Sequence, residues 1–154
     1  MIKLIEISQL DFEKYRSIFI EDETIELIEN YKYPIDVSKD KAIKEFDQCF
    51  PNGKTKDNEF LLSIKSDQLD TDNTLGYLWY SISEDYVFIL DFYIYNEFRG
   101  TGYGTQTISK LQETCLNKNI NQIRLRVAHN NPRALKLYQA LGFNITGTNM
   151  MKRF

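Results

Sequence analysis

A buried strand that runs into a glycine-rich turn and then into a helix limits this chain more than any other feature. Residues 87–94 (VFILDFYI) are apolar on both faces apart from Asp91, which is typical of a central strand covered on both sides. The turn follows over residues 99–105 (RGTGYGT), and apolar residues at helical spacing predict a helix over about residues 102–118. Such a connection places the next strand parallel to the first and beside it.

The remaining pattern predicts one α/β domain over residues 1–154, with a mixed and mostly antiparallel sheet. A length of 154 residues suits one domain with a sizeable core. Before the buried strand we expect a short strand at Ile2 and Leu4, then one long or two short helices from residue 8 or 9 to about 30, and a helix capped by Asp36 or Ser38 that ends near Phe50. Strands at 60–64 and 75–82 follow, joined by a polar turn at 66–73. After the glycine-rich turn and its helix we expect a strand at 122–127, a helix opened by Asn131-Pro132, and a closing strand at 143–151.

Composition excludes several classes of protein. The longest apolar run, Tyr86 to Leu90, is too short to span a bilayer, and the acidic N-terminal stretch does not resemble a signal peptide. Two cysteines do not make a disulfide framework, so we expect a cytoplasmic protein with no membrane partner. Cys115 lies on the apolar helix stripe, and the single histidine, His129, lies in a polar stretch. We therefore expect no metal site.

The charges are divided unevenly along the chain. Residues 1–113 contain all 22 acidic residues and carry a net charge of −10, whereas residues 114–154 carry +7. The basic residues of that last part are Lys118, Arg124, Arg126, Arg133, Lys136, Lys152 and Arg153. Such a segment on an acidic protein indicates a bound anion, although a solvated surface is the alternative.

The glycine-rich turn can hold a phosphate group. Alternating glycines let backbone N–H groups converge at the start of a helix, where the dipole favours an anion, although tight packing alone could also explain them. A Walker A loop would need a lysine after its last glycine, and here Thr105 follows Gly104. A dinucleotide site would need Gly-x-Gly-x-x-Gly and a later acidic residue, but no acid follows Glu113.

Two linked motifs resemble the signatures of the GNAT superfamily of N-acetyltransferases. The segment from Arg99 to Gly104 resembles its acetyl-CoA signature, Arg/Gln-x-x-Gly-x-Gly/Ala, and Asn131 to Phe143 resembles Asn-x-x-Ala-x-x-x-Tyr-x-x-x-Gly-Phe. The motifs occur in the order of that family, with one helix and one strand between them. The resemblance covers residues 75–154 well and residues 1–74 only by the order of elements.

The resemblance implies acetyl-CoA as the co-substrate and a particular set of contacts with it. The backbone of the turn would hold the pyrophosphate, and the end of the preceding strand would pair with the pantetheine arm and supply an N–H to the thioester oxygen. Asn131, Arg133 and Lys136 would also face the cofactor, although Asn131 before a proline is equally an ordinary helix N-cap. The cofactor-binding residues expected are Phe92, Tyr93, Ile94, Arg99, Gly100, Thr101, Gly102, Tyr103, Gly104, Thr105, Asn131, Arg133 and Lys136.

Two residues are candidates for catalysis. The resemblance implies Tyr138 as the general acid that protonates the CoA thiolate, whereas its spacing with Ala134 and Leu141 would also suit a core residue. Asp91 is a candidate general base because burial in an apolar strand raises the pKa of a carboxyl group. A structural Asp91, bonded to nearby N–H groups, is an equal alternative. Strand alternation places Asp91 on the face of the strand opposite to Phe92 and Ile94, unless a bulge changes this arrangement.

We therefore expect direct acetyl transfer from acetyl-CoA to a primary amine in a ternary complex. The alternatives are a non-catalytic acyl-CoA-binding or regulatory module on the same fold, and a domain that binds NAD or ATP. Acidic residues 21–29 suggest either a solvated helix face or a preference for a cationic amine. No nucleic-acid partner is expected. The sequence identifies neither the acceptor nor the oligomeric state, and a homodimer is one open possibility.

Overall fold

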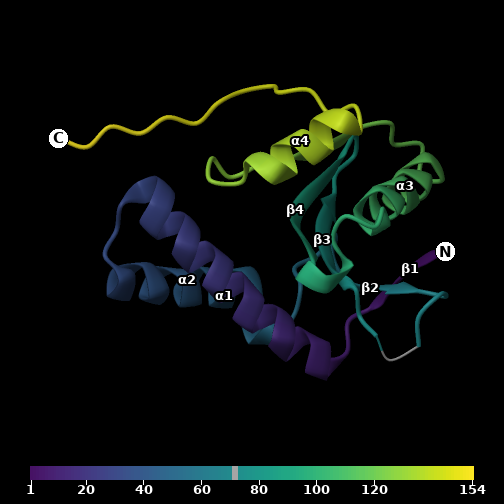
Figure 1. Ribbon diagram of the computed structural model, residues 1–154, viewed down its shortest axis with the longest axis horizontal. Helices are drawn as coiled ribbons and strands as arrows, with labels where there is room; N and C mark the ends of the chain where they lie inside the picture. Colours follow the sequence, from purple (N-terminus) through teal and green to yellow (C-terminus); the bar gives the residue numbers. More distant parts are fainter. Residues whose placement is uncertain (71–72) are drawn as a thin grey trace.

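The computed structural model describes residues 1–70 and 73–154 and contains a five-stranded sheet flanked by helices (Figure 1). Its elements in chain order are β1 (Ile2–Glu6), α1 (Gln9–Tyr31), α2 (Ile35–Cys49), η1 (Pro51–Gly53), β2 (Glu59–Ser66), β3 (Gly76–Ile82), β4 (Val87–Ile94), η2 (Asn96–Phe98), α3 (Tyr103–Leu116), β5 (Ile123–Leu125) and α4 (Pro132–Ala140). The predicted turn at 66–73 includes residues 71 and 72, which lie outside the described residues.

The order of strands in the sheet is the order in the chain, β1 to β5. The first four strands are antiparallel, and β5 is parallel to β4, as predicted from the strand, turn and helix that join them. The mixed, mostly antiparallel α/β fold is thereby confirmed. Among the described residues, no helix is long and apolar enough to cross a membrane.

Two hydrophobic clusters lie on opposite faces of the sheet. On one face, α1 and α2 bury Tyr15 and Phe46 against Tyr77 and Trp79. On the other face, α3 packs Ile108 and other apolar residues of its inner stripe against the strands, and α4 continues this layer (Figure 1). The side chain of Cys115 is buried in that second cluster, as expected from its helical stripe.

A β-bulge in β4 decides which face each side chain of this strand occupies. The register with β3 shifts between Trp79 and Tyr80, so Leu90 is an extra residue between Ile89 and Asp91. Phe92 therefore belongs to the same cluster as Ile89, and Asp91 points to the opposite face, towards α1. Without the bulge, Asp91 would share the face of Ile89.

Three sequence predictions need correction. Residues 143–151 do not form a closing strand; beyond Phe143 they run as an extended tail. The strand predicted at 122–127 is only the three residues of β5. Finally, neither Asp36 nor Ser38 caps α2: the helix begins earlier, at Ile35, so both lie inside it, and its N-cap residue is Pro34, whose side chain has no acceptor atom. The first helix is one helix, capped by Ser8, whose side chain accepts from the Asp11 amide at 3.1 Å.

Candidate active site

A gap between β4 and β5 forms the centre of the candidate site. The two strands pair only from Val87 to Ile89, so the rest of β4 has no strand partner on that side among the described residues. Polar groups of an unpaired strand are free to bond a ligand. Two cavities lie along this gap, one on each face of the sheet, and they share Phe92, Arg99, Asn131, Ala134 and Tyr138.

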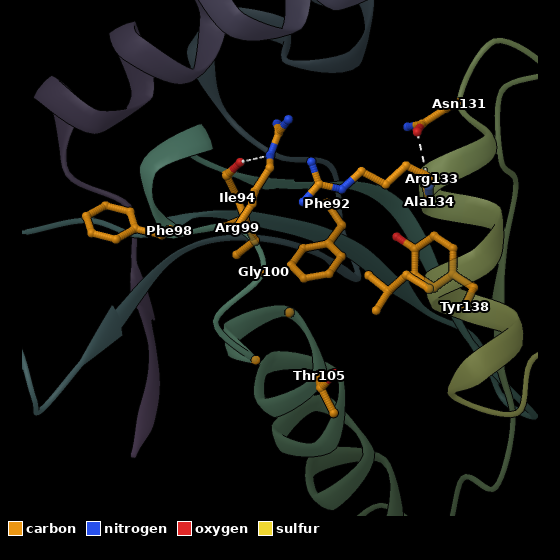
Figure 2. Close-up of a pocket in the computed structure, with 13 residues that line it drawn as sticks. Phe92, Ile94, Phe98, Arg99, Gly100, Thr105, Asn131, Arg133, Ala134 and Tyr138 are labelled. Atoms are coloured by element: carbon orange, nitrogen blue, oxygen red, sulfur yellow. Dashed lines mark hydrogen bonds between the residues drawn. The ribbon is translucent and has the colours of Figure 1, made fainter.

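The first cavity, of about 290 Å³, lies between the end of β4, the glycine-rich turn and α4 (Figure 2). Its lining residues are Phe92, Ile94, Phe98, Arg99, Gly100, Gly102, Gly104, Thr105, Asn131, Arg133, Ala134, Leu137 and Tyr138. Ten of the residues predicted from sequence are among them. The local structure thus brings both sequence motifs to one cavity.

The glycine-rich turn presents backbone donors at the start of α3. Gly100 and Gly102 have φ angles of 74° and 88°, in the left-handed region that favours glycine. The first α-helical hydrogen bond of α3 runs from the Gln106 amide to the Gly102 carbonyl at 3.0 Å. The amides before Gln106 therefore have no carbonyl partner within the helix, and the positive end of the helix dipole adds to them.

Two arginines flank this turn. Arg133 reaches from α4 towards Phe92 across the cavity (Figure 2), and among the described residues it forms no ion pair. Arg99 is held in place because its Nε donates to the Ile94 carbonyl at 2.7 Å and its guanidinium lies over the Tyr93 ring. Asn131 caps α4 by accepting from the Ala134 amide at 3.1 Å, so its structural role is present alongside its position in the cavity.

Four predicted cofactor residues lie outside the first cavity. Thr101 donates to the Phe98 carbonyl at 2.6 Å, and Tyr103 packs against the Phe98 ring, so both stabilise the turn. Tyr93 lines the second cavity instead. Lys136 is exposed on α4 and lines neither cavity.

Tyr138 is buried at the junction of the two cavities. Its ring packs edge-on against Phe143, and the side chain is 8% exposed. No described residue forms a hydrogen bond with its hydroxyl, and no buried polar side-chain atom of the described residues lacks a partner, so the hydroxyl opens on the cavity. Burial, and then the nearby charge of Asp91, raise the pKa of Tyr138 well above its ordinary value. The phenol is therefore protonated at neutral pH.

Asp91 lines the second cavity and is held by two hydrogen bonds. The Tyr15 hydroxyl donates to its Oδ2 at 2.7 Å, and the Phe92 amide donates to its Oδ1 at 2.9 Å. Burial raises the pKa of Asp91, and both hydrogen bonds oppose that rise because they stabilise the carboxylate. The Phe92 N–H would have to leave Asp91 before it could bond a thioester oxygen.

The second cavity, of about 560 Å³, lies between β4, β5 and the helices α1 and α2. Its acidic lining residues are Asp22, Glu23, Glu26, Glu45 and Asp91. Two arginines line the same cavity: Arg126 pairs with Glu26 at 2.8 Å, and Arg99, whose Nε donates to the neutral Ile94 carbonyl, keeps its charge. The cavity wall therefore has an excess of negative charge.

Glu23 and Glu45 form a carboxyl pair in this wall. Burial, and next a hydrogen bond with Glu45 and its charge, raise the pKa of Glu23 to about 8. Sequence reasoning identified the acidic stretch of α1 but not Glu45, because only the packing of α2 on α1 brings these two carboxyls together. Tyr15 was missed as well: its spacing with Phe19 marks it as core, and nothing in the sequence indicates that its hydroxyl reaches Asp91.

We predict that Glu23→Gln stabilises the protein above pH 8. A carboxyl whose pKa is raised on folding stabilises the fold below its unfolded pKa, and this contribution is lost as pH rises through about 8. A glutamine side chain keeps the hydrogen bond without the repulsion, so the gain at pH 9 is on the order of 1 kcal/mol after solvent screening of these partly exposed groups. Urea unfolding at pH 6 and 9 measures it. Glu21→Gln, an exposed neighbour, is the control, and an equal effect of both substitutions would contradict the pairing.

Comparison with known proteins identifies the family. The family model described as "Acetyltransferase (GNAT) family" matches residues 12–143. The uncharacterized N-acetyltransferase YdgE of Bacillus subtilis is 24% identical over 152 residues, which cover 96% of this chain and 95% of YdgE. YycN, an uncharacterized N-acetyltransferase of the same organism, is 30% identical over 70% of each chain. Its crystal structure superposes with a TM-score of 0.87 at 25% identity, covering 100% of this chain and 99% of YycN.

The family model and these named relatives define the class of the protein as an acetyltransferase of the GNAT type. The chain belongs to the GNAT acetyltransferase family, as the two motifs indicated. A solved structure of the PaiA N-acetyltransferase from Thermoplasma acidophilum, in complex with coenzyme A, has the same fold at a TM-score of 0.64 and 19% identity, covering 97% of this chain and 93% of that one.

Proposed function

We propose that this protein transfers the acetyl group of acetyl-CoA directly to a primary amine that carries positive charge. The observation that carries the proposal is the meeting of two chemically different cavities at Tyr138, through the gap in the sheet. One cavity offers glycine amides and Arg133, which suit a diphosphate. The other offers carboxylates, which suit an ammonium group.

Acetyl-CoA would occupy the first cavity. The amides at the start of α3 and the guanidinium of Arg133 would bind the pyrophosphate, while Phe98 and Leu137 line the path of the pantetheine arm. The edge of β4 that has no strand partner among the described residues would pair with the amides of that arm, in the manner of an added strand, and the Ile94 carbonyl would then share or give up its bond from Arg99. The thioester would then lie at the junction of the cavities, beside Tyr138.

The acceptor would enter from the second cavity and react in a ternary complex. Asp91 would accept a proton from the ammonium group, since its carboxylate faces that cavity and its raised pKa improves it as a base. The free amine would attack the thioester carbon, and the C–S bond would break as the tetrahedral intermediate collapses. Tyr138 would donate its proton to the CoA sulfur, because its unpaired hydroxyl opens on the junction. The nitrogen of the new amide would then give its extra proton to the Tyr138 phenolate, which restores the phenol.

The acidic wall supports a cationic acceptor. Among the described residues, five acidic side chains line that cavity against two arginines, and Arg126 is already paired with Glu26. The acidic groups outnumber the cations even with Glu23 protonated at neutral pH. An acceptor with a second ammonium group would supply this missing charge. Bovine thialysine N-epsilon-acetyltransferase, 43% identical over 56 residues that cover 36% of this chain and 33% of that protein, is named for an amine-bearing amino acid.

The experiment that tests this function measures CoA thiol release from acetyl-CoA with paired acceptors. The two acceptors of a pair have the same length and the same amine at one end. At the other end, one acceptor carries a second amine and the other carries a hydroxyl group. We expect the diamine of each pair to be the better substrate, with a kcat/KM roughly tenfold higher or more, since one extra charge contact is worth about 1.4 kcal/mol or more in such a wall. Glu45→Gln should reduce the difference in kcat/KM between the diamine and its hydroxyl counterpart. Equal rates would contradict the cationic acceptor. CoA binding without thiol release for any acceptor would favour the non-catalytic, regulatory module.

Tyr15 provides a further prediction, because it holds Asp91 in place. Tyr15→Phe removes one hydrogen bond that stabilises the carboxylate, which raises the pKa of Asp91 further. Since Asp91 must be ionised to act as a base, the acidic limb of the kcat profile should move to higher pH. Tyr77→Phe, another buried tyrosine that bonds Asp11 and Tyr95 instead, is the control and should leave the limb in place.

A further inference from the structure

The last residues of β4 turn their backbone groups towards the gap in the sheet. In an antiparallel pair, alternate residues direct these groups to the partner strand and away from it. The Tyr95 N–H donates to the Leu75 carbonyl at 2.9 Å, so the register of β3 with β4 directs the backbone groups of Phe92 and Ile94 away from β3. A molecule bound in the gap would therefore meet the backbone of these two residues.

Two of these backbone groups are bonded to side chains. The Phe92 N–H donates to Asp91 Oδ1 at 2.9 Å, and the Ile94 carbonyl accepts from Arg99 Nε at 2.7 Å (Figure 2). The oxygen of a thioester accepts from an N–H, and an added chain also uses the carbonyl groups of the edge. A bound acyl-CoA would therefore compete with Asp91 for the N–H and with Arg99 for the carbonyl.

The competition at Phe92 changes the chemistry of Asp91. The carboxylate accepts one hydrogen bond from Tyr15 and one from Phe92, and both favour its ionised form against the effect of burial. When the Phe92 N–H bonds another oxygen, only the bond from Tyr15 still opposes burial. The carboxylate then holds a proton more tightly, which makes it a better acceptor for the proton of an ammonium group in the second cavity.

We propose that the acetyl group of bound acetyl-CoA takes the Phe92 N–H away from Asp91, so that Asp91 is a stronger base only while an acetyl group is present to be transferred. The inference rests on the proposed function, because it requires the thioester at the junction of the cavities. CoA has the same phosphates and the same pantetheine arm but no acyl oxygen. Asp91 therefore recovers the Phe92 N–H once the acetyl group has left.

The other titratable and charged groups around Asp91 are the same whichever ligand is bound. They are Tyr15, Asp22, Glu23 and Glu26 on α1, Glu45 and Cys49 on α2, Tyr93 on β4, Tyr138 on α4, and Arg99 and Arg126 in the wall of the second cavity. The charge of Glu26 raises the pKa of Asp91, and the phosphates of CoA would act in the same direction. These contributions cancel when acetyl-CoA is compared with CoA and with the thioether S-ethyl-CoA, which fills the space of the acetyl group but has no carbonyl oxygen.

Nuclear magnetic resonance of the wild-type protein tests the proposal with no acceptor amine present. The Asp91 carboxyl carbon, assigned by its absence in Asp91→Asn, and the Phe92 backbone amide are followed against pH in the complexes with the three ligands. We expect a higher pKa of Asp91 with acetyl-CoA than with CoA or S-ethyl-CoA. The Phe92 amide signal should follow the ionisation of Asp91 with CoA and S-ethyl-CoA and should lose most of this dependence with acetyl-CoA. The Tyr15 ring signals should follow it in all three complexes, because that hydrogen bond is kept.

The outcomes separate this inference from the proposed function. The Arg99 Nε–H signal should shift with all three ligands, because they share the arm that competes for the Ile94 carbonyl. If that signal shifts while the pKa of Asp91 and the behaviour of the Phe92 amide are equal in the three complexes, the coupling is overturned and the cofactor site is not. A pKa of Asp91 that rises equally with all three ligands would also overturn the coupling, since the phosphates would then explain the rise. If acetyl-CoA does not bind, the proposed function and this inference both fail.

Discussion

Tyr138→Phe is expected to lower kcat for acetyl transfer by about a hundredfold or more while acetyl-CoA binds as before. A positioned general acid contributes about 10²- to 10⁴-fold to a rate, and the substitution removes only the hydroxyl that opens on the cavity junction. The ring contact with Phe143 is kept, so the fold should be unaffected. Steady-state kinetics and calorimetric titration with CoA measure the two quantities.

The matched control is Tyr86→Phe. Tyr86 lies under the Arg124 guanidinium and lines neither cavity, so the loss of its hydroxyl should leave kcat unchanged. If Tyr138→Phe retained full turnover, Tyr138 would be a core residue of α4 and the thiolate would take its proton from water. If CoA affinity fell in parallel with kcat, the hydroxyl would act in binding.

Asp91→Asn is expected to have the second large effect, a loss of about a hundredfold or more in kcat at pH values where the acceptor amine is still protonated in solution. Asparagine cannot accept the proton of the ammonium group, and the acidic limb of the pH profile, which reports ionisation of Asp91, should disappear. The asparagine side chain can form both hydrogen bonds of Asp91. The Tyr15 hydroxyl can accept from its nitrogen, while the Phe92 backbone N–H still donates to its oxygen. The pH dependence of kcat measures the effect.

Asp85→Asn is the control for this substitution, since Asp85 is exposed in the turn between β3 and β4. The activity of Asp91→Asn should return as pH rises and the acceptor amine loses its proton without help. An unchanged acidic limb in Asp91→Asn would instead assign that limb to another group of the cavity, and Asp91 would then have the structural role that its two hydrogen bonds also permit.

The first cavity, which is the proposed cofactor site, could be predicted from the sequence because its residues are close together in the chain. The strand, the glycine-rich turn and the helix are consecutive, and the positive φ angles of Gly100 and Gly102 follow from the residue type itself. The start of α4 could be predicted for the same reason, because Asn131 and Pro132 directly precede or begin that helix. In the structure Asn131 both caps α4 and lines the first cavity.

The second cavity, which is the proposed acceptor site, could not be predicted in the same way because it depends on tertiary contacts. The bulge at Leu90 turns Asp91 towards α1, and no local signal in residues 87–94 marks the bulge. The bond from Tyr15 to Asp91 joins residues 76 positions apart. The strand pattern of residues 143–151 was recognised, but a pattern indicates only what a segment can form, and whether it forms depends on an edge to pair with.

The central claim is that acetyl-CoA and a cationic amine meet at the junction of the two cavities. The most direct test measures CoA thiol release from acetyl-CoA and one diamine, by the wild-type protein and by Tyr138→Phe. The CoA affinity of both proteins is measured by titration in the same experiment. We expect thiol release to require the diamine and to fall about a hundredfold or more in Tyr138→Phe, while the two proteins bind CoA with equal affinity. Equal thiol release by the two proteins, or none by the wild type with any amine despite CoA binding, would contradict it.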